Sequence, residues 1–255
     1  MSEKILDGRR IIITGGASGM GEGLVRAFPD LGARVVSMDL TEEAGQKIAL
    51  ESEAAGFVKL DVTNQDSVIS GVAAAVKILG GLDVLIHAAG IAPSAKAEDI
   101  SLDLWSNVLA VNATGTFLMN QAVFPYLKDK GGAILNFASA AGIQGYPNKA
   151  AYAAAKGAVL AWNRSIAQEW GKYNISVNAI APAIWTPMYD KTRSEMSSEQ
   201  LIAHDEMMSK EIPLGGKLGD IQKDFVPVLA FLASKGAHFM TGQVFPIDGG
   251  VLMMR

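Results

Sequence analysis

The stretch RIIITGGASGMG, residues 10–21, decides the fold of this 255-residue chain. It joins a short apolar run to a glycine-rich loop, and a helical pattern follows at once. Glycines permit a tight turn and let the backbone approach a pyrophosphate, which then lies at the positive end of the helix. A second apolar run begins at Arg34, as a strand–loop–helix–strand unit requires. The stretch therefore predicts a dinucleotide-binding site at the start of a parallel sheet.

Short apolar runs alternate with helical patterns along the rest of the chain. Several runs are apolar on both faces, as strands covered by helices on both sides must be. The alternation predicts an α/β fold: right-handed βαβ units in a Rossmann-type, doubly wound parallel sheet with helices on both faces. The expected strands are 10–14, 34–38, 57–60, 83–87, 133–137, 175–180 and 244–247, and the expected helices are 20–31, 42–54, 65–79, 102–128, 151–171 and 220–233.

Two signals set the ends of expected helices. Pro29 falls in the last turn of the first helix and should kink or shorten it, because proline lacks an amide hydrogen. Thr63 or Asn64 can cap the third.

No repeat or linker divides the chain, so residues 1–255 are expected to form a single dinucleotide-binding and catalytic domain. Residues 185–216 are polar, bear methionines and lack strand signal, which is typical of a substrate loop or lid.

Composition excludes several classes of protein. With 49% hydrophobic and 19% charged residues, the chain suits one compact domain. No apolar run reaches transmembrane length and residues 1–10 are too polar for a signal peptide, so a cytoplasmic protein without a membrane partner is expected. A net charge of −4 without a basic patch argues against nucleic acid. There is no cysteine, and His87, His204 and His238 are scattered, so no metal site is predicted.

Tyr152 and Lys156 are separated by three alanines. On a helix, positions i and i+4 lie on the same face. Free tyrosine has a pKa of about 10, and a nearby positive charge favours the phenolate and brings that pKa toward the working range. The pair is therefore a candidate general acid/base. The alternative is an exposed surface pair, since this spacing arises by chance in alanine-rich helices.

Asp39, at the end of the second expected strand, indicates which dinucleotide would bind. A carboxylate there can accept hydrogen bonds from the adenosine ribose hydroxyls, and it repels a 2′-phosphate. No basic residue flanks it, since Leu40 follows, and Ser18 precedes Gly19 in the glycine loop. NAD is therefore favoured over NADP as the cofactor. The alternative is that Asp39 only caps a loop.

These features belong to a longer series of motifs in a fixed order. The series is T-G-x-x-x-G-x-G at residues 14–21, Asp61-Val62, Ala88-Ala89-Gly90, Asn112, Ser139 and Tyr152-x-x-x-Lys156. It closely resembles the short-chain dehydrogenase/reductase superfamily, in its single-domain branch, over essentially the whole chain. The resemblance implies a seven-stranded sheet in the order 3-2-1-4-5-6-7, and a homotetramer or dimer.

The resemblance also implies roles for individual residues. Tyr152 is the expected general acid/base at the substrate oxygen, and Lys156 is expected to lower the pKa of Tyr152 and to bind the nicotinamide ribose. Ser139 would hold and polarise the same substrate oxygen, unless it only caps the strand. Asn112 would support a water that links the lysine to solvent, unless it only kinks a helix. The residues expected at the cofactor are Gly15, Ser18, Gly19, Met20, Gly21, Asp39, Asp61, Val62, Ala89, Gly90, Tyr152, Lys156, Ile184 and Thr186.

Two stretches depart from the family pattern. Residues 87–90 read HAAG where the family often has NNAG, so side-chain hydrogen bonds that stabilise the central sheet are lost. His87 is interpreted as a structural residue at a strand end. Residues 182–186 read PAIWT, one residue shorter than the family's Pro-Gly turn and without its glycine. The carboxamide contacts of that turn are assigned to Ile184 and Thr186, while Trp185 either faces the substrate or packs the turn.

The expected function is NAD(H)-dependent hydride transfer between nicotinamide and a hydrophobic secondary alcohol or ketone. The alternatives are a catalytically inactive nucleotide-binding regulatory protein, and a dehydratase or epimerase on the same fold. Methionines adapt to irregular apolar shapes, although those of the expected helix 198–210 can instead pack against the body or a neighbouring subunit. The candidate pocket walls are residues 92–93, 143–147, Trp185, Met188, Tyr189, Met196, Met207 and Met208.

Overall fold

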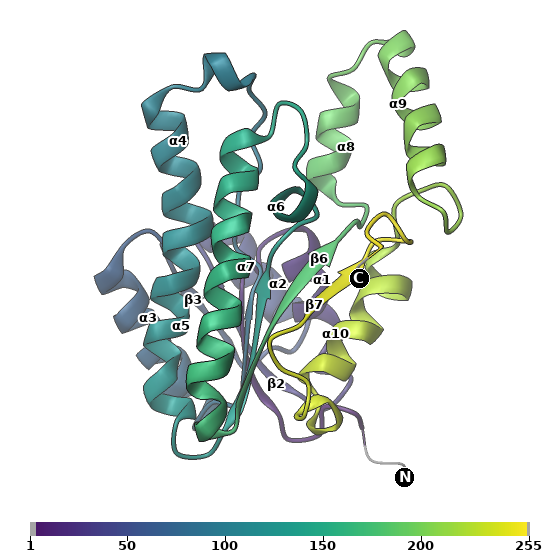
Figure 1. Ribbon diagram of the computed structural model, residues 1–255. Coiled ribbons are helices and arrows are strands. Elements are labelled where there is room, and N and C mark those ends of the chain that lie inside the picture. The colour runs from purple at the N-terminus through teal and green to yellow at the C-terminus, as the bar shows by residue number, and fades with distance from the viewer. Residues whose placement is uncertain (1–3, 254–255) are drawn as a thin grey trace.

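The computed structural model describes residues 4–253, and its centre is one parallel sheet (Figure 1). The seven strands lie in the order β3-β2-β1-β4-β5-β6-β7, which confirms the expected topology. Every expected strand is present, with ends that differ from the prediction by two residues at most. The strands are β1 Arg10–Thr14, β2 Arg34–Asp39, β3 Gly56–Lys59, β4 Val84–His87, β5 Gly132–Phe137, β6 Ile175–Pro182 and β7 Val244–Ile247.

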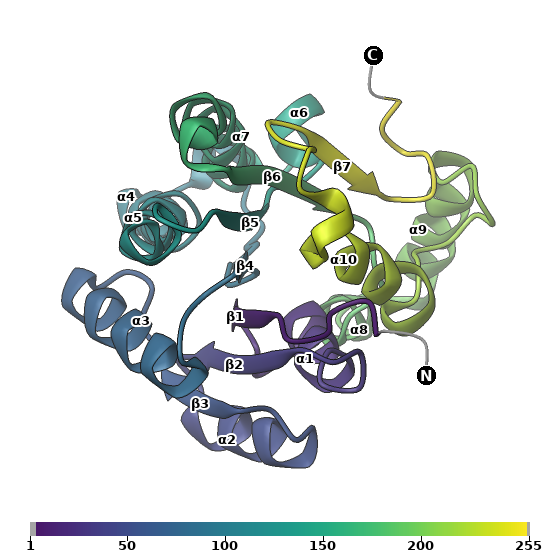
Figure 2. The same ribbon diagram turned by 90° about the horizontal axis from the view of Figure 1, so that it is seen from below.

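Helices cover both faces of the sheet, as expected. Helices α3, α5 and α7 bury one face, and α1, α2 and α10 bury the other (Figure 2). The α-helices are α1 Gly19–Ala27, α2 Glu42–Glu51, α3 Gln65–Leu79, α4 Leu102–Leu109, α5 Gly115–Leu127, α6 Ala141–Gln144, α7 Ala150–Trp170, α8 Pro187–Ser194, α9 Ser198–Glu211 and α10 Val226–Ala233. Within residues 4–253, none of the helices is both long and apolar enough to cross a membrane.

The ends of α1 and α3 follow from single residues. Helix α1 stops at Ala27, two residues before Pro29, and so confirms the expected shortening. Asn64 caps α3 by accepting a hydrogen bond of 2.9 Å from the amide of Ser67, so Asn64 and not Thr63 is the cap. Helix α1 thus ends before a proline, and α3 begins at a side chain that caps a free backbone amide.

The expected helix 102–128 is interrupted, which corrects the prediction. A π-helical turn, Ala110–Thr114, separates α4 from α5, and Asn112 lies at its centre. Such a turn holds one extra residue within the helical path and is frequent at functional sites. A second π-helical turn, Ile221–Phe225, precedes α10. Apolar periodicity alone does not distinguish these turns from a regular helix.

Three buried asparagines fix α5 and α7 against β5. The side-chain amides of Asn120 and Asn136 exchange two hydrogen bonds of 2.9 Å. Asn136 also donates to Asn163 on α7 at 3.3 Å, and Asn163 donates to the carbonyl of Val177 on β6 at 3.3 Å. Buried amides must be satisfied, so this network sets the position of α7, the helix that carries Tyr152.

Residues 185–216 form an arm of two helices, α8 and α9, that projects beyond the body next to the end of β6 (Figure 1). The expected helix 198–210 is confirmed as α9, whereas α8 was not expected. The arm leaves and rejoins the body at adjacent points. Ile184 pairs with Gly219, and the amide of Trp185 donates to the carbonyl of Gly219 at 2.8 Å.

Candidate active site

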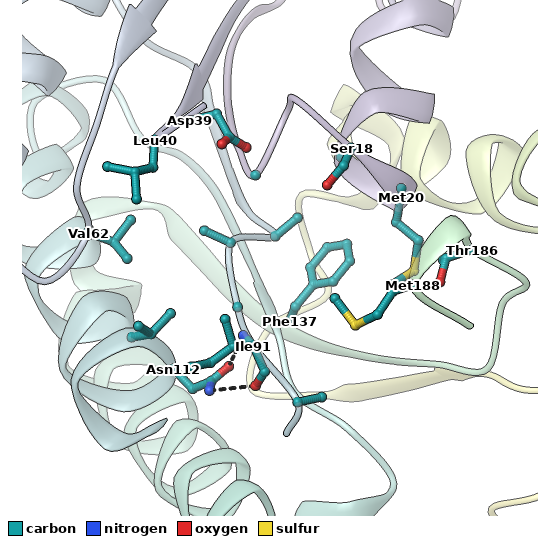
Figure 3. A pocket seen from close by; sticks show the side chains of 18 of the residues that line it. Ser18, Met20, Asp39, Leu40, Val62, Ile91, Asn112, Phe137, Thr186 and Met188 are labelled. Carbon is teal, nitrogen blue, oxygen red and sulfur yellow. Dashed lines mark hydrogen bonds between the residues drawn. The ribbon is translucent and has the colours of Figure 1, made fainter. Parts of the chain in front are cut away.

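A cavity of ≈ 420 Å³ follows the carboxyl ends of the strands. Its volume lies within the range of about 300–1,000 Å³ usual for ligand pockets. Figure 3 shows Asp39 at one side of it and Met20, Thr186 and Met188 together at another. Every site residue expected from the sequence lines this cavity except Ile184; these are Gly15, Ser18, Gly19, Met20, Gly21, Asp39, Asp61, Val62, Ala89, Gly90, Asn112, Ser139, Tyr152, Lys156 and Thr186.

The glycine loop forms a cradle of bare backbone. A Cβ at Gly15 would lie 2.9 Å from the amide nitrogen of Ala89, and one at Gly21 would lie 2.1 Å from the carbonyl oxygen of Gly15. Gly19 has a φ of +57°, and the nearest atom to a Cβ there would be 3.9 Å away, so this side of the loop is open. Helix α1 begins at Gly19, and its first amides point toward this space. The cradle therefore fits a pyrophosphate.

Asp39 both lines the cavity and holds the loops around it. Its Oδ2 accepts from the amide of Ala17 at 3.1 Å, and its Oδ1 accepts from the amide of Thr41 at 2.9 Å. A carboxylate has about four acceptor sites, so two bonds leave capacity for ribose hydroxyls. The two interpretations of Asp39, loop cap and ribose ligand, are therefore compatible.

His87 lies in the centre of the sheet, one residue before the Ala88-Ala89-Gly90 turn. Its Nδ1 is 2.8 Å from the hydroxyl of Thr14, which also accepts from the amide of Ala89 at 3.2 Å. Burial, together with the charge of Lys156, lowers the pKa of His87 to about 3. Its Nε2 has no hydrogen-bond partner within residues 4–253. The imidazole is thus neutral, and it ties β4 to β1 below the cavity.

Asn112 holds the loop that follows β4. Its side-chain amide donates to the carbonyl of Ile91 at 2.9 Å and to that of Val108 at 3.1 Å, and its Oδ1 accepts from the amide of Ile91 at 3.3 Å (Figure 3). A Cβ at Gly90 would lie 2.7 Å from that Oδ1 and 3.5 Å from Nζ of Lys156. The structure therefore gives Asn112 a positioning role at the π-helical turn.

Tyr152, Lys156 and Ser139 meet at the end of β5. The tyrosine and lysine lie one turn apart on α7, and Ser139 is two residues beyond the strand. The Ser139 hydroxyl accepts from the amide of Ala141 at 3.1 Å, and Nζ of Lys156 donates to the carbonyl of Phe137 at 2.6 Å. That ammonium lies 5.7 Å from the centre of the Tyr152 ring. The three side chains expected to handle the proton thus share one wall of the cavity.

Burial is the largest influence on the pKa of each member of this pair. Burial raises the pKa of Tyr152 above its ordinary value, and the Ser139 hydroxyl opposes that rise. Burial also lowers the pKa of Lys156 to about 8. The carbonyl of Phe137 holds the ammonium of Lys156, which lies 5.7 Å from the centre of the tyrosine ring. That Lys156 lowers the pKa of Tyr152 during the reaction stays a prediction.

In the shortened turn, residues 182–186, Ile184 is buried in the core whereas Thr186 lines the cavity. Ile184 is 7% exposed and its side chain packs in the core below β6, so it does not line the cavity. Its neighbours Ala183 and Trp185 bond to Gly219 at 3.0 and 2.8 Å. Thr186 does line the cavity, and its hydroxyl caps α8 by accepting from the amide of Tyr189. Of this turn, the side chain of Thr186 is available to a ligand.

The arm contributes one methionine to the cavity. Of the expected pocket walls, Ala92 and Met188 line it. Trp185 and Tyr189 turn away and pack edge to face, 4.9 Å between ring centres. Arg193 stacks 5.1 Å from the Trp185 ring and pairs with Asp205 on α9, and the hydroxyl of Tyr189 lies 2.7 Å from Nε2 of His204. Trp185 therefore packs against α8, whose Arg193 pairs with α9, and it is not among the residues that line the cavity.

Sequence reasoning missed Phe137 as a functional residue. Its main-chain carbonyl holds Lys156, and its side chain lines the cavity (Figure 3). The only signal was its place at the end of a buried strand, directly before Ser139. Other lining residues were not among the expected site residues, although they lie in or beside the expected motifs: Met38, Leu40, Leu60, Thr63, Ala88, Ile91, Val111, Ala138, Pro182 and Pro187.

Comparison with known proteins gives consistent matches. Residues 15–252 match the family described as enoyl-(acyl carrier protein) reductase. The chain is 36% identical over 250 residues to trans-4-hydroxycyclohexanecarboxylate dehydrogenase of Sinomonas cyclohexanicum, covering 94% of this chain and 91% of the relative. It is 37% identical over 251 residues to 2,5-dichloro-2,5-cyclohexadiene-1,4-diol dehydrogenase of Sphingobium indicum, covering 96% of each.

Solved structures agree with this assignment. The crystal structure of a protein described as a short-chain alcohol dehydrogenase from Sinorhizobium meliloti 1021 superposes with a TM-score of 0.88. The two chains are 30% identical, and the match covers 99% of this chain and 100% of the other. With the sheet order, the glycine cradle and the Ser139, Tyr152 and Lys156 wall, these matches show that the chain belongs to the short-chain dehydrogenase/reductase superfamily and is an oxidoreductase that uses a nicotinamide cofactor.

Proposed function

We propose that the protein is an NAD(H)-dependent dehydrogenase that interconverts a hydrophobic, ring-sized secondary alcohol and its ketone. The observation that carries the proposal is that one cavity joins Asp39 to Ser139, Tyr152 and Lys156. One end of the cavity therefore suits an adenosine ribose, and the other suits a proton transfer. A nucleotide-binding protein without catalysis would need only the first end.

In this proposal, different residues of the cavity hold different parts of the cofactor. The backbone of the glycine loop would hold the pyrophosphate, and Asp39 the adenosine ribose. Lys156 and Tyr152 would hold the nicotinamide ribose, and Thr186 the carboxamide. The nicotinamide ring supplies the hydride acceptor or donor.

The protein's own part in the reaction is to move one proton. In the oxidation direction, the phenolate of Tyr152 takes the proton of the substrate hydroxyl, and in reduction the phenol returns it. The Ser139 hydroxyl, which lines the cavity with Tyr152, holds the same substrate oxygen in place. Lys156, fixed by the carbonyl of Phe137, adds a positive charge to the wall where a phenolate develops.

Cofactor choice rests on Asp39. Its carboxylate would repel a 2′-phosphate, and the residue that follows is Leu40, which lines the cavity and offers no positive charge. Lys156 is the only basic residue among those that line the cavity within residues 4–253, and it lies at the far end. These features favour NAD over NADP.

The substrate class is supported by the apolar wall and by the relatives. Met20, Phe137 and Met188 lie together near the catalytic end (Figure 3). Both relatives described above are named for the oxidation of hydroxyl groups on six-membered rings. A cyclic secondary alcohol is therefore the first substrate to test.

The test is a dehydrogenase assay over cyclic, aliphatic and aryl alcohols, followed at the nicotinamide absorbance with NAD and NADP in parallel. We expect turnover with NAD, and we expect Tyr152→Phe to lower kcat by about 10³-fold or more with the affinity for NADH changed by less than about twofold. Tyr126→Phe on the exposed surface of α5 is the matched control. Full activity in Tyr152→Phe would exclude the tyrosine mechanism, and turnover without stoichiometric NADH release would favour a dehydratase or epimerase.

A further inference from the structure

Lys149 is a half-buried cation without a counter-charge. It precedes α7 directly and lies three residues before Tyr152. Its ammonium donates to the carbonyl of Ala92, and Ala92 lines the cavity. No ion pair in the described part of the chain includes Lys149. The positive charge therefore lies next to a residue of the cavity wall, although Lys149 itself does not line the cavity, and no ion pair within residues 4–253 balances it.

A structural role does not explain the charge. The bond to Ala92 pins the loop after β4 to the start of α7, and the amide of Ala95 strengthens this contact by donating to the carbonyl of Asn148 at 3.0 Å. A neutral donor such as glutamine would serve the same purpose. Burying a charge without a partner disfavours the fold. In agreement, burial lowers the pKa of Lys149.

The position of Lys149 relative to Tyr152 suits a small substrate. Lys149 is the N-cap of α7 and Tyr152 is the third residue of that helix, so the two residues are separated by less than one helical turn. Two acidic residues line the cavity: Asp39 ends β2 and Asp61 follows β3, so both belong to the adenosine side. An anion near Ala92 would also meet the positive end of the α7 dipole, since Lys149 is the N-cap of that 21-residue helix.

We infer that Lys149 binds the carboxylate of the substrate, which makes the substrate a hydroxy acid, or the corresponding keto acid, whose reacting carbon lies about one ring away from the carboxylate. The inference rests on the proposed function, because it assumes that Tyr152 acts on a secondary alcohol. The inference adds that the substrate carries a negative charge, and it identifies Lys149 as the residue that selects for this charge.

The experiment compares an acid with its neutral isostere. The probes are trans-4-hydroxycyclohexanecarboxylate and trans-4-hydroxycyclohexanecarboxamide, which differ in charge but scarcely in shape. We expect the wild-type enzyme to oxidise the acid with a kcat/KM at least about 10-fold higher than that of the amide. Lys149→Met should lower kcat/KM for the acid by about 10–100-fold, mainly through KM, and change the value for the amide by less than about threefold.

Two further variants separate charge from structure. Lys149→Gln keeps a donor for Ala92 without the charge and should lose the acid preference as Lys149→Met does, whereas Lys149→Arg should retain most of it. Lys96 is an exposed lysine on the loop after β4, and Lys96→Met is the control for a change in net charge. It should leave kcat/KM unchanged for both the acid and the amide.

The outcomes that overturn the inference differ from those that overturn the proposed function. Equal losses for acid and amide in Lys149→Met, or an unchanged acid preference in Lys149→Gln, would reduce Lys149 to a structural contact. A wild-type enzyme that oxidises neutral alcohols and does not prefer the acid would contradict the carboxylate subsite alone. Only a failure to oxidise any alcohol would count against the dehydrogenase itself.

Discussion

Lys156 is charged in a place where a neutral side chain would be more stable. It is 4% exposed, and burial lowers its pKa from 10.5 to about 8. Below pH 8 the folded protein bears the full cost of burying the ammonium, and this cost disappears as the pH rises from about 8 to 10.5. The difference corresponds to about 3 kcal/mol, at about 1.4 kcal/mol for each pH unit. Such a cost is common where function needs a buried charge.

We therefore expect Lys156→Met to stabilise the protein at pH 7 while it abolishes turnover. The gain should be about 2 kcal/mol, because the lost hydrogen bond to Phe137 offsets about 1 kcal/mol. It should diminish as the pH approaches 10.5. Chemical denaturation of both proteins at pH 7 and pH 10 measures this difference, and a variant less stable than the wild type at pH 7 would contradict the explanation.

Among the elements, α6 and α7 approach each other so closely that only glycine fits between them. A Cβ at Gly142 on α6 would lie 2.6 Å from the carbonyl carbon of Lys156 and 2.7 Å from the amide nitrogen of Gly157. Backbone atoms cannot move aside as a flexible side chain can. Since Gly142 also donates from its amide to the carbonyl of Ser139 at 3.0 Å, this contact sets the distance between the serine and the tyrosine helix.

Gly142→Ala should therefore displace Ser139 from Tyr152. We expect kcat/KM to fall by about 10–100-fold, as for other displacements of about 1 Å, and stability to fall by about 1–3 kcal/mol from overpacking. Gly157→Ala is the matched control on the other side of the contact, because its Cβ would meet the carbonyl of Gly142 at an ordinary 3.6 Å. It should be neutral or slightly stabilising, and steady-state kinetics with thermal unfolding of both variants tests the pair. Equal behaviour of the two would contradict this account.

The elements could be predicted where local chemistry decides them. The RIIIT run, Pro29 and Asn64 each gave a correct strand or helix end, because the signal lies within a few neighbouring residues. The π-helical turn at Asn112 could not be predicted, since it depends on hydrogen bonds to Ile91, 21 residues away. The burial of Ile184 likewise depends on its pairing with Gly219, and the direction of Lys156 on the carbonyl of Phe137.

At the scale of the whole molecule, ligand binding should stabilise the chain as one unit. A ligand that binds only the folded state adds RT ln(1 + [L]/Kd), which is about 2.7 kcal/mol at 100 times Kd. We expect NAD to raise the melting temperature by several degrees and NADP at the same concentration to raise it much less. Asp39→Asn should narrow this difference, because it removes the charge that repels a 2′-phosphate. Thermal unfolding of both proteins with each dinucleotide measures it, and a larger shift with NADP in the wild type would reverse the cofactor assignment.

Assembly into a homotetramer or dimer stays a prediction. Large apolar side chains are exposed on the single chain, including Phe239, which is 93% exposed, and Met253, which is 73% exposed. Both lie toward the C-terminal end of the sequence, and exposed apolar side chains of this kind are often buried where subunits meet. Light scattering of the purified protein measures the mass directly.

The pairing of Ile184 with Gly219 has a consequence for engineering. Because the two-helix arm departs from the body and returns to it at neighbouring positions, its length and sequence can change without altering the spacing of the strands. Contacts within the arm, such as the ion pair between Arg193 and Asp205, involve only residues of the arm and are transferred together with it. The segment 187–218 is therefore a natural cassette for grafting between homologues, because its exchange leaves Thr186 in place. Exchanging it would re-tailor which molecule enters the cavity and leave the cofactor machinery as it is.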